Sequence, residues 1–130
     1  GELSLYAKSI DTPLYRLLKH FLPGPYTFIL PASKQVPKIL KTRKQTIGLR
    51  IPDHAITRAI IHELGHPLLS TSVPGTSPEE IADPENIRER LGKQVDIFVN
   101  AGTGGFVPST IINATTEEPE LVRQGLGEWK

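Results

Sequence analysis

Two histidines and a glutamate form the sharpest chemical pattern in the sequence, in the segment His62-Glu63-Leu64-Gly65-His66. Two histidines four residues apart lie on one face of a helix and can share a zinc ion, while the glutamate activates the bound water. The flanking residues oppose this geometry, because Pro67 disfavours a helical conformation at His66 and Gly65 is typical of a helix end. We therefore favour an ordinary exposed helix end, with a zinc metallopeptidase as the alternative function.

Hydroxyl groups and arginines recur at the ends of the strands that the sequence predicts. Hydroxyls and planar guanidinium groups suit the recognition of phosphate and carboxylate oxygens, and arginine can donate two parallel hydrogen bonds to them. Ligands of α/β proteins usually bind at strand ends. For each residue taken singly, a surface or strand-edge role is the simplest interpretation, whereas their recurrence favours an anion-binding site. Its candidates are Thr46, Arg50, Ser70, Ser72, Ser109, Thr110 and Arg123.

One concentration of basic residues lies between positions 34 and 44 of the chain. Its simplest interpretation is a solvated helix end and loop, and the alternative is a surface that faces phosphate groups. A double-stranded RNA-binding module without catalysis is therefore a further candidate function. Its RNA contacts would come from Lys41, Arg43 and Lys44.

Helix and strand signals alternate along the chain, which predicts an α/β layer with a mixed or largely parallel sheet. Cap residues and helical spacing predict helices near residues 12–21, 53–64 and 83–91, and the second of these is expected to begin at the cap Asp53. We expect the last two strands to pair antiparallel. The strands are predicted at residues 26–30, 46–51, 68–72, 95–99, 109–112 and 121–123.

The composition is typical of one globular domain, because the 130 residues are 38% apolar and 22% charged. We therefore expect residues 1–130 to form a single domain. No apolar run reaches membrane-spanning length and no secretory signal opens the sequence, so we expect no membrane partner. The chain contains no cysteine, which fits a reducing compartment, and we expect a cytoplasmic protein.

Five ordered motifs resemble the successive signatures of the YrdC-like domain family, and they are most similar to its YciO-type branch. The resemblance extends from Pro13 to about Gly127, which is nearly the whole chain. Five motifs in the family's order are far more specific than any one of them. They read LPGPYTFIL at 22–30, TIGLRIPDH at 46–54, GHPLLSTS at 65–72, PSTII at 108–112 and LVRQG at 121–125.

The resemblance implies a twisted open α/β sheet with flanking helices around a concave, positively charged cavity. Enzymes of the family are nucleotidyltransferases that make threonylcarbamoyl-adenylate from L-threonine, bicarbonate and ATP, for a tRNA modification. The implied partners are these three substrates and RNA, either tRNA or double-stranded RNA. Magnesium would accompany ATP, bound mainly through the phosphates, and no tightly bound cofactor is expected.

The resemblance also implies roles for individual residues. Arg50 and Ser109 would hold the threonine carboxylate or the carbamoyl region. No covalent nucleophile is required, since the site has to orient a carbamate against an α-phosphate. The nucleotide side would be lined by Thr46, Ser70, Ser72 and Arg123.

Two departures from the family pattern argue against adenylate synthesis by the chain as it stands. Family enzymes carry a Lys-x-Arg pair in an N-terminal portion that is not found before Pro13, so we expect the chain to be the C-terminal two-thirds of the domain. Active enzymes have Ser-Ala-Asn where this chain has Ser72-Val73-Pro74, and Pro74 cannot supply the asparagine side chain. A sheet without some of its strands has an unpaired edge, so we also expect self-association.

Overall fold

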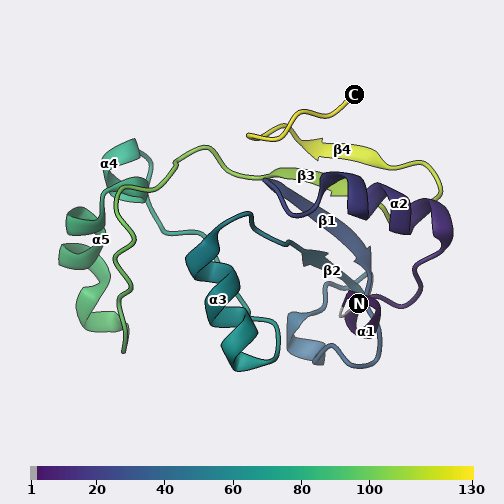
Figure 1. Cartoon of the computed structure of the whole chain (residues 1–130), viewed down its shortest axis with the longest axis horizontal. Helices are drawn as coiled ribbons and strands as arrows, with labels where there is room; N and C mark the ends of the chain where they lie inside the picture. Colours follow the sequence, from purple (N-terminus) through teal and green to yellow (C-terminus); the bar gives the residue numbers. More distant parts are fainter. Residues whose placement is uncertain (1–2) are drawn as a thin grey trace. The chain divides into compact units, whose positions relative to one another are not determined.

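A computed structural model of the chain describes residues 3–130 (Figure 1). The chain divides into two compact units. Of the described residues, 3–53 and 109–130 form the first, which we call the sheet unit, and 54–108 form the second, which we call the helical unit. The two segments of the sheet unit are distant in sequence, so strand pairing has to join them.

The sheet unit contains a mixed four-stranded sheet in the order β2-β1-β3-β4 (Figure 1). The central pair β1 and β3 is parallel, whereas β2 pairs antiparallel with β1 and β4 antiparallel with β3. This α/β architecture confirms the predicted fold class and the predicted antiparallel pairing of the last two strands. The strands are β1 (Tyr26–Pro31), β2 (Thr46–Leu49), β3 (Thr110–Asn113) and β4 (Glu120–Arg123).

Helix α2 (Thr12–Phe21) packs across β1 and β3 (Figure 1). It begins as predicted, because the Asp11 carboxylate accepts a hydrogen bond from the Leu14 N–H at 2.9 Å. Its apolar stripe contributes Leu18 to a core whose central side chains, Phe28 and Ile112, are fully buried. The sheet unit also contains α1 (Leu3–Tyr6) and the short 3-10 helix η1 (Lys38–Leu40).

The buried Thr110 hydroxyl ties the C-terminal segment to the sheet. It donates a hydrogen bond to the Gly127 carbonyl at 2.5 Å and accepts one from the Gly125 N–H at 3.0 Å. A side chain at Gly127 would overlap the Tyr26 ring, since a Cβ there would lie 2.4 Å from that ring. The C-terminal segment therefore passes so close to Tyr26 of β1 that the position is suited to glycine.

The helical unit contains three α-helices whose first turns are capped by side chains. His54, Ser77 and Asp83 each accept a hydrogen bond from a backbone N–H of the helix that follows. Arg90 of the third helix links three parts of this unit. Its side chain donates hydrogen bonds to the Asn86 side chain at 2.7 Å and to the carbonyls of Pro74 and Glu80. The elements are α3 (Ala55–Leu64), α4 (Pro78–Ala82), α5 (Pro84–Leu91) and the 3-10 helix η2 (Gly92–Gln94).

Three predictions about residues 53–108 are wrong. The segments 68–72 and 95–99 have no strand structure, and apolar side chains such as Leu69 and Ile97 are 76% and 81% exposed. Their composition favours strands, but a strand needs a neighbour to accept its backbone hydrogen bonds, and none is found among the described residues. Asp53 is not the cap of α3, because the His54 ring nitrogen takes that position.

The Thr110 hydroxyl leads to a test of stability. The change Thr110→Val removes both hydrogen bonds and leaves a carbonyl and an N–H without their partner. We expect the free energy of unfolding to fall by about 1–3 kcal/mol. Urea denaturation measures this, with Thr116→Val as the control because Thr116 is exposed in the turn between β3 and β4. Equal stability of the two variants would contradict the role given to Thr110.

A second test concerns Glu80, whose pKa is held below its ordinary value of 4.5 by the Thr76 backbone N–H and then by the Ser77 hydroxyl. A lowered pKa in the folded state stabilises the fold above pH 4.5, and this contribution is lost as the pH falls through the lowered value. We expect Glu80→Gln to unfold at a lower temperature than the wild type at pH 7, with the difference shrinking in acid. Glu79→Gln is the control, and a pH-independent difference would contradict this account.

Candidate functional site

Two hydroxyl groups meet where β1 and β3 begin. The Thr27 and Ser109 side-chain oxygens lie 2.7 Å apart, although the residues are 82 positions apart in sequence. The parallel register, which pairs Tyr26 with Thr110, brings them together. Ser109 is only 8% exposed, so its hydroxyl is held in a fixed place at the end of the sheet.

Arg123 at the end of β4 is fixed beside these hydroxyls. Its Nε and Nη2 atoms donate to the Ser109 carbonyl at 3.1 and 2.8 Å, and Nη2 lies 3.5 Å from the Ser109 hydroxyl oxygen. The side chain remains exposed, so its charge is open to a ligand from solvent. An oriented guanidinium next to two hydroxyls is suited to a carboxylate or a phosphate.

Arg50 belongs to the same end of the sheet. It follows β2 directly, and because Leu49 pairs with Phe28, the Arg50 backbone lies at the Thr27 end of β1. Its side chain is exposed. The structure therefore brings together three of the predicted residues, Arg50, Ser109 and Arg123, and adds Thr27. We call this group the hydroxyl–arginine site.

Thr27 was missed by the sequence analysis. A lone threonine in an apolar strand is ordinarily a residue of good strand propensity rather than a ligand. The available signal was its position inside the motif at residues 22–30, directly after the prolines that precede β1. Only the pairing with β3 shows that its hydroxyl meets Ser109.

Thr46 lies at the opposite end of the sheet. It pairs with Pro31, and its hydroxyl oxygen is 2.7 Å from that of Thr42. A six-residue strand separates the ends of β1 by roughly 16 Å, so Thr46 and Arg123 are not neighbours. Their shared role on the nucleotide side was implied by the family resemblance and is not tested by this geometry. Because Arg123 lies beside Ser109, we assign it to the threonine side in the proposal below.

Ser70 and Ser72 lie in the helical unit, in the exposed segment after α3 that has no regular structure. Their predicted nucleotide contacts stay predictions. The segment is anchored just beyond them, because the Pro74 carbonyl accepts a hydrogen bond from Arg90 Nη1 at 3.0 Å. Position 74 is thus fixed to α5 through its backbone.

The histidine pair does not have the geometry of a zinc helix. Helix α3 ends at Leu64, and Gly65 adopts a left-handed conformation with φ 75°, as the sequence predicted. His66 lies beyond the helix, with its Nδ1 atom 2.8 Å from the Pro67 carbonyl oxygen. Among residues 3–130 there is no group of three potential metal ligands, so the zinc metallopeptidase lacks structural support.

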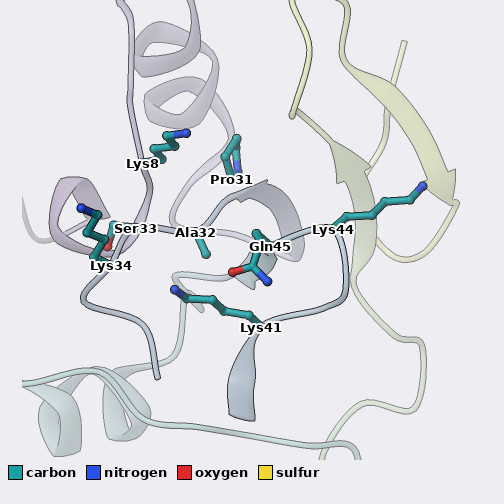
Figure 2. A pocket seen from close by; sticks show the side chains of 8 residues that line it. All are labelled: Lys8, Pro31, Ala32, Ser33, Lys34, Lys41, Lys44 and Gln45. Carbon is teal, nitrogen blue, oxygen red and sulfur yellow. The ribbon is translucent and has the colours of Figure 1, made fainter. Parts of the chain in front are cut away.

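The basic segment forms part of a pocket in the sheet unit, which we call the lysine pocket (Figure 2). Its volume is about 460 Å³. Two residues predicted to contact RNA, Lys41 and Lys44, line it, whereas Arg43 does not. The RNA contacts themselves stay predictions. The lining residues are Lys8, Pro31, Ala32, Ser33, Lys34, Lys41, Lys44 and Gln45.

No helix in the described part of the chain has the length and apolar character needed to cross a membrane.

Comparison with known proteins identifies the family. The model of the Sua5, YciO and YrdC proteins, which is described as telomere recombination, matches residues 1–125. The chain belongs to this family. It is 44% identical over 133 residues to the uncharacterized protein YciO of Escherichia coli (strain K12), and this alignment covers 100% of the chain and 64% of YciO. The chain therefore spans less than two-thirds of the length of that relative.

Solved structures and a named enzyme support the same assignment. The crystal structure of E. coli YciO matches with a TM-score of 0.89 and 42% identity, over 98% of this chain and 62% of YciO. The P. abyssi Sua5 structure complexed with L-threonine matches with a TM-score of 0.81 and 27% identity, over 95% of this chain and 37% of Sua5. A threonylcarbamoyl-AMP synthase of Idiomarina loihiensis is 39% identical over 76% of this chain and 53% of its own length.

Proposed function

We propose that the hydroxyl–arginine site binds L-threonine through its carboxylate, as part of a protein related to the threonylcarbamoyl-AMP synthases. The observation that carries this proposal is Arg123, which two hydrogen bonds to the Ser109 carbonyl hold beside the Ser109 and Thr27 hydroxyls. A similar structure, that of P. abyssi Sua5, was solved in complex with L-threonine. A carboxylate there would accept from the guanidinium and from hydroxyl groups.

The proposed reaction joins threonine, bicarbonate and ATP. The threonine amine attacks the carbon of bicarbonate and water leaves, which gives a carbamate. A carbamate oxygen then attacks the α-phosphorus of ATP, and pyrophosphate leaves. Magnesium bound together with ATP would neutralise charge on the phosphates. The contribution of this chain is to orient the reacting groups and to stabilise negative charge through Arg50 and Arg123, so no covalent nucleophile is needed.

Binding at this site can be tested directly on the complete protein. We expect Arg123→Gln and Ser109→Ala each to weaken L-threonine binding by roughly tenfold, because each removes a partner of the carboxylate. Isothermal titration calorimetry measures the affinity. Arg16→Gln is the matched control, since Arg16 is an exposed arginine on α2. Wild-type affinity in Arg123→Gln would contradict the proposal.

Pro74 allows a separate test of turnover. We propose that proline at this position limits adenylate synthesis, because it offers no side-chain amide to a phosphate. We expect Pro74→Asn to increase pyrophosphate release that requires both threonine and bicarbonate. The neighbouring change Val73→Ala is the control. Threonine binding without any such release, in both wild type and Pro74→Asn, would contradict adenylate synthesis and leave a binding role.

A further inference from the structure

We infer that the lysine pocket is a binding site for a compact anion carrying two or more phosphate groups. The pocket lies at the Pro31 end of β1, whereas the hydroxyl–arginine site lies at the Thr27 end. Thr27 and Pro31 are four residues apart along the strand, so the two sites are separated by roughly 13 Å. This inference does not depend on threonine binding.

The first observation is uncompensated charge. Four of the eight lining residues are lysines, and none of the described residues that line the pocket is acidic. Within residues 3–130, these lysines form no ion pairs. Like charges around a common concavity repel one another, and a multiply charged anion would remove that repulsion. A ligand with several phosphate groups has the matching charge.

The second observation is the arrangement of the ammonium groups. In Figure 2, Lys8 lies above Ala32 and the Lys41 ammonium group reaches beneath it, whereas the Lys34 ammonium group at the left edge is turned away and Lys44 extends away to the right. Ser33 and Gln45 add a hydroxyl and an amide to the lining. We therefore expect Lys8 and Lys41 to carry most of the affinity.

The third observation is that the backbone beneath these side chains is fixed. The Lys8 N–H donates to the Pro31 carbonyl at 2.7 Å, and the Ala32 N–H donates to the Gln45 carbonyl at 2.8 Å. Gln45 adopts a left-handed conformation with φ 58° in the turn before β2, where its N–H donates to the Thr42 carbonyl at 2.9 Å. The turn therefore holds this lining residue in place.

The shape of the pocket favours a compact ligand over a nucleic-acid duplex. Its volume of about 460 Å³ is that of a small-molecule site. The lysines come from three separate segments that meet at one open hollow. They do not follow a single helix or strand, as lysines that contact a long nucleic-acid backbone would. Free oligophosphates and the phosphate tail of a nucleotide share this chemistry, so both belong in the test.

The test is calorimetric titration of the complete protein with sodium tripolyphosphate, inorganic phosphate, ATP and AMP at low salt. The same titrations are repeated with the Arg123→Gln variant, so that anion binding at the lysine pocket can be distinguished from binding at the hydroxyl–arginine site. We expect tripolyphosphate to bind more tightly than phosphate, with an affinity that falls as salt is added. Similar binding of ATP and tripolyphosphate with weak binding of AMP would show that the phosphates alone are recognised.

Variants locate the site. We expect Lys8→Ala combined with Lys41→Ala to weaken tripolyphosphate binding by roughly tenfold, and Lys44→Ala to weaken it less. Lys38→Ala is the matched control, since Lys38 is an exposed lysine of η1 outside the pocket. The inference is overturned if tripolyphosphate does not bind, if Lys38→Ala weakens it as much as the double change, or if these lysines affect only duplex RNA.

Discussion

The parallel pairing of β1 with β3 is the constraint on which the rest of the sheet unit depends. It joins residues 26–29 to residues 110–113 across a long intervening stretch that includes the entire helical unit. Closing so long a loop has an entropic cost, which the fully buried Phe28 and Ile112 offset by packing together with α2. Without this pair, Thr27 and Ser109 would have no reason to meet.

The same strand positions two chemically different sites. At its beginning, β1 places hydroxyls beside the arginine that β4 contributes, which suits a single carboxylate or phosphate. At its end, β1 leads into the pocket that the lysines surround, which suits several phosphates. The Thr110 hydroxyl supports the first site indirectly, because it holds the segment after Arg123 against the sheet. In this proposal, the two binding functions depend on the side chains at each strand end rather than on the sheet itself.

The sequence predicted the parts of the fold whose signals are local. Asp11 with the apolar spacing after it predicts α2, and the motif order predicts the family. It failed where structure depends on a neighbour, as in the exposed segments 68–72 and 95–99. Arg50, Ser109 and Arg123 were predicted from their types, but Thr27 and Lys8 were not, because only strand pairing and folding bring them to their sites.

The most direct measurement is an amide chemical-shift titration of the complete protein with L-threonine. The account predicts saturable shifts confined to the start of β1, the start of β3 and the end of β4, centred on Thr27, Ser109 and Arg123. Shifts centred instead on Ala32 and Gln45 would place the amino acid in the lysine pocket. That outcome, or the absence of any saturable shift, would contradict a threonine carboxylate held by Arg123.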